Sequence, residues 1–219
     1  MRLDNQVLYQ SPSFGGFSFG GGYSFNADDK SNASTPNFQT SDNNRETNFG
    51  VRYASGPLYV TATYDRLTPT NSAVGGQSDA RIQQVALGAT YDFEVVKLHA
   101  AVGQTRDGWF VGTSLGTTPD GYTSTGSFRL ADGFKATSTM LGFTVPFGRS
   151  DIFGSWQRAD PSNDKLTGDA KTTNIYALGY KYDLSKRTNV YAYGAYGTDY
   201  AFQDGLRDLA FAVGLRHIF

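Results

Sequence analysis

The segment of this sequence that comes closest to a catalytic motif is a serine between two glycines. Gly112–Gly116 fits the pattern G-x-S-x-G, in which a sharp strand-to-helix turn presents the serine as a nucleophile. That chemistry needs a histidine and an acid later in the chain, and the only later histidine is His217, on the apolar side of an expected strand. The motif itself lies in a long polar segment. We therefore expect Ser114 to be an ordinary loop residue and the protein not to be an enzyme.

Residues that bind metals or cofactors are equally scarce. Cys 0 excludes disulfides, thiolate metal sites and cysteine nucleophiles, and His 2 leaves too few histidines for a multi-histidine centre. His99 lies on the polar side of an expected strand without the partner spacing of a membrane-boundary lipase. The loop acids Asp28, Asp29, Asp160 and Asp164 could bind divalent cations, but they lack the spacing of a calcium loop. We expect solvated acids, no metal and no cofactor.

Composition narrows the class of protein further. The 219 residues carry Lys+Arg 19 and Asp+Glu 20, a net charge of -1 without blocks of either sign, which argues against a nucleic-acid partner. The mean hydropathy is -0.41, and no apolar run approaches the ~18 residues of a membrane helix. Aromatic residues reach 15% and Gly 26, which is typical of many twisted strands joined by polar loops. We expect a single domain over residues 1–219.

Apolar and polar residues alternate with period two along most of the chain. In 84–93, for example, Val85, Leu87, Ala89 and Tyr91 occupy one side. Short turns and long polar segments follow one another in alternation, which predicts an antiparallel meander with two different ends. The faces around 191–196 stay unassigned because both look amphipathic. The expected strands are eleven: 2–10, 16–26, 45–54, 57–66, 80–93, 95–106, 134–146, 150–159, 172–183, 187–198 and 207–219.

Two architectures suit such a meander. A soluble sandwich buries its apolar side against a second sheet, whereas a membrane barrel turns its apolar side to lipid and lines a wet lumen with small or charged residues. The polar sides here are rich in Gly and Ser with isolated charges, the strands have the length of a tilted bilayer crossing, and Tyr and Phe cluster near strand ends. These features favour the membrane barrel, although the sandwich stays open.

Three segments carry a resemblance to a known family. Residues 2–17 read R-x-D-N-x-V-x-Y-x-S-P-x-F-x-G-F, residues 184–191 form a short turn flanked by strands, and residues 214–219 end the chain in an aromatic residue. These segments resemble the general, non-specific diffusion porins of Gram-negative beta-proteobacteria. The final alternation also resembles the C-terminal strand that the barrel assembly machinery recognises in outer-membrane proteins. Its residues would be Phe211, Val213, Leu215, His217 and Phe219.

The resemblance implies an outer-membrane location and a specific architecture. Members of that family are trimeric, sixteen-stranded up-and-down β-barrels through which small hydrophilic solutes and ions diffuse passively. They are embedded in lipid and lipopolysaccharide. By this alignment the chain supplies only the last eleven strands, without the first five, the signal peptide and the inward-folded constriction loop. We therefore expect an incomplete transmembrane barrel, and a homotrimer where the barrel is complete.

Charged residues on the polar sides are the candidate pore-lining residues. Family members order permeating ions in a transverse field between a basic wall and an acidic constriction loop, and charged rings bias ion choice in pores generally. Simple solvation on a wet surface is the alternative for each single charge, and the better one. The candidates are Arg2, Arg52, Lys97, Lys181, Arg216, Asp65 and Asp92.

The sequence leaves three functions to separate. The first is a passive porin, and the second is a barrel without an open pore whose long loops bind partners at the cell surface. The third, an enzyme barrel, is disfavoured by the histidine placement. Because an odd number of meandering strands makes the first and last run the same way, we also expect an open, curved sheet with two free edges that aggregates when expressed alone and conducts poorly.

Overall fold

The computed structural model describes residues 3–27, 43–69, 80–110 and 128–219, and these residues form one antiparallel sheet. Neighbours in sequence are neighbours in the sheet, from β1 to β11. The predicted all-β meander of eleven strands is therefore confirmed. The strands are β1 (Gln6–Gln10), β2 (Phe17–Ser24), β3 (Arg45–Ser55), β4 (Leu58–Thr68), β5 (Ile82–Asp92), β6 (Lys97–Phe110), β7 (Phe128–Phe147), β8 (Ser150–Pro161), β9 (Thr173–Asp183), β10 (Thr188–Thr198) and β11 (Arg207–His217).

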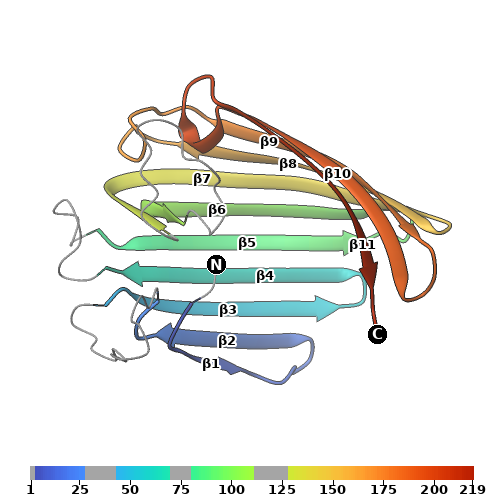
Figure 1. Ribbon diagram of the computed structural model, residues 1–219. Coiled ribbons are helices and arrows are strands. Elements are labelled where there is room, and N and C mark those ends of the chain that lie inside the picture. Colours follow the sequence, from blue (N-terminus) through green and yellow to red (C-terminus); the bar gives the residue numbers. More distant parts are fainter. Residues whose placement is uncertain (1–2, 28–42, 70–79, 111–127) are drawn as a thin grey trace, which may run out of the picture.

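The sheet is curved and open. Figure 1 shows β1 to β6 side by side, with β8 to β11 curling over toward the viewer, so that the sheet forms a trough. Among the described residues, no ladder of hydrogen bonds joins β1 to β11. The two strands are thus free edges, as expected for an incomplete barrel. No helix in the described part of the chain has the length and apolar character needed to cross a membrane.

The two ends of the trough differ as the turn chemistry predicted. All short connections lie at one end, which we call the turn end, and the strand ends that lead into the long segments lie at the other, the loop end (Figure 1). Two-residue connections join β3 to β4 and β7 to β8, and each contains a glycine, Gly56 with a φ of 53° and Gly148 with a φ of 61°, in the left-handed region that glycine adopts at low cost. A register without slips then continues across β3, β4 and β5.

The predicted strand limits were wrong in two segments whose polar composition indicated loops. Residues 107–133 were expected to be a loop, yet β6 extends to Phe110 and β7 begins at Phe128. Their pairing slips between Arg106 and Gly108, where a bulge gives Asp107 a φ of 59°. Residues 199–206 likewise hold the short 3-10 helix η2 (Tyr200–Phe202) instead of only a polar loop.

The termini also need correction. β1 begins at Gln6 instead of residue 2, and β11 ends at His217, so that Ile218 and Phe219 continue beyond the last strand. The unassigned strand around 191–196 is β10. Tyr191 and Tyr193 lie on the same side of the sheet as their partners Lys181 and Gly179.

Buried apolar residues gather at the loop end. In one cluster, Trp109 and Phe134 from β6 and β7 meet Phe202 from η2, with ring centroids 5.0 to 6.4 Å apart, and the Trp109 ring lies nearly perpendicular to the other two. A second cluster packs Leu67 and Ile82, both fully buried, between β4 and β5. These contacts stabilise the loop end of the sheet. Elsewhere in the trough, many large apolar side chains are exposed.

Candidate pore-lining face

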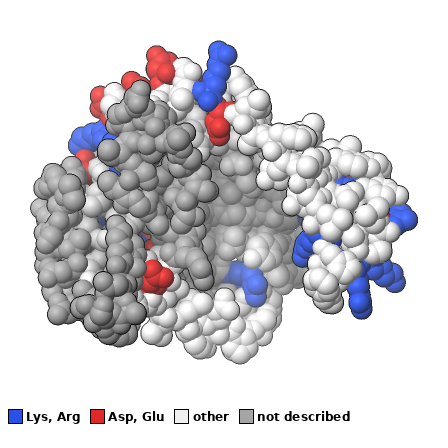
Figure 2. All heavy atoms as spheres, viewed as in Figure 1, with Lys and Arg blue, Asp and Glu red and all other residues white. Residues whose placement is uncertain are grey.

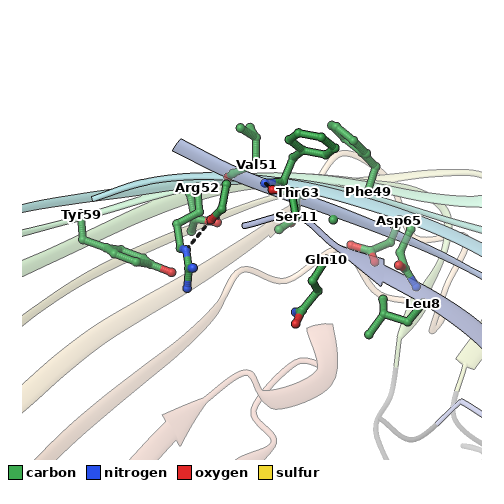
Figure 3. A pocket seen from close by; sticks show the side chains of 16 residues that line it. Leu8, Gln10, Ser11, Phe49, Val51, Arg52, Tyr59, Thr63 and Asp65 are labelled. Carbon is green, nitrogen blue, oxygen red and sulfur yellow. Dashed lines mark hydrogen bonds between the residues drawn. The ribbon is translucent and has the colours of Figure 1, made fainter. Parts of the chain in front are cut away.

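Strand alternation gives the sheet an inward face, toward which it curls, and an outward face. Figure 3 shows Gln10, Arg52 and Tyr59 pointing to the inward side, whereas Phe49 and Val51 point the opposite way. Direct partners in an antiparallel ladder share a face, so the register extends this assignment to every strand. The outward face carries the exposed apolar side chains, which include Phe17, Phe19, Phe49, Val51, Val85, Leu87, Leu98, Val102, Leu141, Phe143, Ile152, Tyr176, Leu178, Tyr180, Phe211, Val213 and Leu215.

The middle of the inward face consists of small and polar side chains. His99 lies at its centre, and its two ring nitrogens lie 3.1 Å from the Thr90 hydroxyl and 3.3 Å from the Thr144 hydroxyl. Within the part of the chain that the structure describes, the hydrogen-bonding contacts of this imidazole are with threonine hydroxyls and not with the acid that a hydrolytic relay needs. One continuous row of cross-strand partners crosses this region: Tyr59, Thr90, His99, Gly142, Ser155, Ala177, Ala195 and Ala210.

Arg52 and Asp65 line the same hollow in the wall, next to the free edge at β1. The hollow has a volume of about 390 Å³ and is bordered by Gln10, Ser18 and Tyr59 as well (Figure 3). The Arg52 Nε donates a hydrogen bond of 2.9 Å to the Ser18 hydroxyl, and no ion pair within the described residues joins Arg52 to Asp65. This arrangement places an exposed guanidinium and a half-buried carboxylate on one wall without an ion pair between them.

Two of the other predicted cations, Lys97 and Lys181, form ion pairs with acids at the turn end. Lys97 lies 2.9 Å from its cross-strand partner Asp92, at the turn between β5 and β6. Lys181 is 2.7 Å from its partner Asp151 and 3.3 Å from Asp183. A basic wall was implied by the resemblance, but here these two lysines each face carboxylates, so the wall is a mosaic of both signs.

Sequence reasoning missed an aromatic cover on the inward face between β8 and β11. A Cβ built on Gly179 would meet the Phe153 ring, and one built on Gly214 would meet the Tyr191 ring. The rings therefore lie flat over glycines on neighbouring strands, and Tyr191 and Tyr193 stack at 6.4 Å with their planes 14° apart. The signal available in the sequence was the isolated glycine within each strand, which leaves room for a neighbouring ring.

The remaining predicted residues lie in different surroundings. Arg2 is outside the described residues. Arg216 shares the inward face with its partner Asn189 at the turn end. Figure 2 shows basic side chains gathered at that end of the molecule, which also carries the turn residues Arg149, Lys186 and Arg187.

The proposed assembly signal is exposed along the free edge of β11. Phe211, Val213 and Leu215 occupy its outward face, with exposed fractions of 74%, 70% and 64%. His217 ends the strand on the same face, its Nδ1 2.9 Å from the Thr188 hydroxyl, and its ring meets the fully exposed Phe219 edge-to-face at 4.9 Å. The geometry keeps all five side chains accessible from outside the sheet.

The structure describes only some of the residues considered for catalysis and cation binding. Ser114, Asp28 and Asp29 lie outside the described residues. The Asp160 carboxylate accepts hydrogen bonds from Arg158 and Thr172. In the described ranges, no group of three His, Cys, Asp or Glu side chains could hold a metal ion.

An open antiparallel trough with an apolar outward face and a polar inward face is the wall of an outer-membrane β-barrel. The sequence comparisons agree with this class. Residues 1–200 match the Gram-negative porin family, and the chain belongs to that family. It is 48% identical over its whole length to an outer membrane porin protein of Bordetella pertussis, and 31% identical over 87% of its length to outer membrane porin protein 32 of Delftia acidovorans. The predicted porin fold and outer-membrane location are confirmed.

The chain spans about half the length of these curated relatives, 58% of the first and 45% of the second. Solved structures give the same picture for the fold. Salmonella typhi OmpF aligns with 98% of this chain at a TM-score of 0.65 and 18% identity, and the chain covers 62% of it. OmpT of Vibrio cholerae aligns equally well at 13% identity, with 66% covered. Both barrels thus contain wall that the eleven strands do not supply.

Proposed function

We propose that this chain forms most of the wall of an outer-membrane porin, through which small hydrophilic solutes and ions diffuse passively. The observation that carries the proposal is the inward face. Its central row of small and polar side chains, with both signs of charge at either side, suits a water-filled passage that admits many solutes without binding one. No step of such diffusion needs a nucleophile, a metal or a cofactor, so the proposed activity is not enzymatic.

The arrangement of charges supports weak ion selectivity. Lys97 and Lys181 are balanced by adjacent carboxylates, and Arg52 shares its hollow with Asp65. Charges of opposite sign a few ångströms apart cancel at longer range, and salt screens what remains within about 10 Å at 0.1 M. The field across this wall is therefore local, and we propose a passage that discriminates mainly by size.

Porin structures that align with this chain include a trimer, and we propose a homotrimer of completed barrels here as well. The barrel assembly machinery is the proposed partner during insertion, through the side chains of β11 from Phe211 onward. Lipid and lipopolysaccharide are the proposed surroundings of the outward face. Each of these partners contacts a different part of the outward face or its edge, so each can be tested separately.

Cysteine labelling tests which face is wet. The natural chain has no cysteine, so an introduced thiol is the only one in these 219 residues that a membrane-impermeant maleimide can modify. Ala101 points inward and its neighbour Val102 points outward on the same strand. In a barrel completed with the N-terminal strands of the Bordetella pertussis relative, we expect Ala101→Cys to react and to reduce conductance, and Val102→Cys to be protected by lipid. Equal labelling of both would contradict the proposal.

Conductance separates the porin from a barrel without an open pore. We expect the completed barrel to give uniform steps in a planar bilayer, and the 219-residue chain alone to give irregular conductance or none. A folded, completed barrel that never conducts would favour a surface-binding role for its loops. Uniform steps from the chain alone would show that it closes by itself.

A further inference from the structure

The outward face at the loop end carries cations in a single line across four strands. Arg66 on β4 is the cross-strand partner of Gln83 on β5, which is the partner of Arg106 on β6, which in turn is the partner of Lys135 on β7. Direct partners share a face, and neighbouring strands lie about 4.8 Å apart, so the three cations fall within about 15 Å of one another. All three side chains are exposed.

Within the described residues, none of these three cations forms an ion pair. Every ion pair between described residues uses another cation, and the Arg106 Nε instead donates a hydrogen bond of 2.9 Å to the Gln104 amide oxygen. The neighbouring carboxylate of Asp107 accepts the backbone N–H of Gly133 at 3.0 Å. The acid next to this line on the outward face, Asp160, already bonds Arg158 and Thr172.

Two pairs of oppositely charged sequence neighbours lie on opposite faces of the wall near the loop end. Outward Arg66 follows inward Asp65 in β4, and outward Arg207 precedes inward Asp208 in β11. Strand alternation separates these oppositely charged neighbours onto opposite faces. In each pair the cation faces outward and the acid faces inward.

The line of cations borders the apolar band most closely on β4 and β5. Two residues toward the turn end, the next outward row holds Phe49, Tyr64 and Val85 on β3 to β5, and it continues as Gln104 and Thr137 on β6 and β7. Such a step is about 7 Å, which is the distance between the edge of the hydrocarbon and the charged headgroups of a leaflet. Lipid-facing cations at that height meet phosphates, whereas the same residues in a soluble surface would meet only water.

We propose that Arg66, Arg106 and Lys135 form a binding site for the phosphate groups of lipids in the leaflet at the loop end. This inference rests on the proposed function only in that both place the apolar band in the membrane. Guanidinium groups suit phosphate because they donate paired N–H bonds, and Gln83 between them adds a neutral amide donor. The site would anchor a phosphorylated headgroup across β4 to β7 and hold the barrel at a fixed depth.

The test measures lipid binding by the completed barrel in zwitterionic micelles, with bisphosphorylated lipid A as the probe. Each cation near a lipid surface contributes on the order of 1 kcal/mol, so R66Q/R106Q/K135Q should bind about a hundredfold more weakly than the natural chain. The matched control R149Q/K186Q/R187Q removes three cations at the turn end and should stay within about twofold. Lipid A without its phosphates should bind as weakly to the natural chain as lipid A binds to the triple variant.

Two further arms keep the result interpretable. The charge-preserving variant R66K/R106K/K135R should retain most of the affinity, so a loss confined to the glutamine variant cannot be assigned to misfolding. Inorganic phosphate alone should compete only weakly, because the acyl chains must pack on the apolar band below the cations. Equal binding of phosphorylated and dephosphorylated lipid, or an equal loss in the turn-end control, would overturn the site. Conductance is measured separately and decides the proposed function alone.

Discussion

The turn end and the loop end of the trough are built on different principles. At the turn end, oppositely charged side chains pair across neighbouring strands on a wet surface, as in Lys181 with Asp151 and Lys97 with Asp92. At the loop end, aromatic and aliphatic side chains are buried, with Phe134 only 1% exposed. Burial of apolar area stabilises far more than an exposed ion pair does. We infer that the buried cluster at the loop end contributes more to the stability of the sheet than the ion pairs do. The ion pairs at the turn end determine the charge of the inward face there.

The largest expected effect comes from breaking the loop-end cluster. Phe134→Ala removes the ring that contacts Trp109 and Phe202, and buried Phe→Ala changes cost about 3–5 kcal/mol. Urea unfolding of the completed barrel in vesicles, followed by tryptophan fluorescence, measures the loss. Phe143→Ala, at an outward position of β7, is the control and should cost much less. Equal losses would show that the cluster does not hold the loop end.

A second prediction compares the two faces at one height. Leu87→Arg puts a charge on the lipid-facing side and should cost roughly 2–4 kcal/mol of unfolding free energy. Gly88→Arg places the same side chain inward, where the nearest side-chain atom to a new Cβ is Thr61 Cγ2 at an ordinary 3.5 Å. It should fold normally and lower conductance. Comparable damage from both substitutions would indicate two buried faces, as in a soluble sandwich.

The charge mosaic of the turn end can be unbalanced with little structural cost. Lys181→Gln leaves Asp151 and Asp183 uncompensated, and the pairs are partly exposed, so stability should fall by less than about 1 kcal/mol. Selectivity should shift toward cations, and high salt should reduce the shift. The reversal potential in a salt gradient measures it. Lys97→Gln is the matched change at the other ion pair, and an unchanged potential in both variants would place these residues away from the ion path.

The smallest expected effect on stability is at the chain terminus. Phe219 lies beyond β11 and is fully exposed, so its deletion should change the unfolding free energy by less than about 0.5 kcal/mol. Insertion should nevertheless slow, because the terminal aromatic residue belongs to the proposed assembly signal. The rate at which a heat-modifiable folded form accumulates in cells measures this. The control is Lys186→Ala, which changes an exposed turn residue and preserves the length of the turn.

Most strands could be predicted because one physical rule governs them. Wherever one face meets lipid and the other meets water, residues must alternate with period two, as Val85, Leu87 and Ala89 do. The rule failed at residues 107–110 and 128–133, where β6 and β7 rise beyond the membrane band and both faces meet polar surroundings or the cluster around Trp109. Without a lipid face, pairing continues but the alternation that reveals it does not.

The sequence predicted which face of the sheet the candidate residues lie on. It did not predict which side chains they contact. Alternation placed Arg52, Lys97 and Lys181 on the polar side, and the register puts them on the inward face. Which acid each lysine meets depends on cross-strand register, which brings together residues such as Asp151 and Lys181 that lie far apart in sequence. The flat rings over Gly179 and Gly214 depend on the same register and were missed for that reason.

The free edges at β1 and β11 impose an arithmetic condition on whatever completes the wall. Every neighbouring pair in the sheet is antiparallel, so odd-numbered strands all run in one direction and both edges run the same way. A segment that bridges them by antiparallel pairing alone must begin and end with strands of the opposite direction. It must therefore contribute an odd number of strands, and the closed barrel must have an even number. Inserting or removing a single strand in any engineered completion should abolish closure, whereas adding or removing a whole hairpin should only change the diameter.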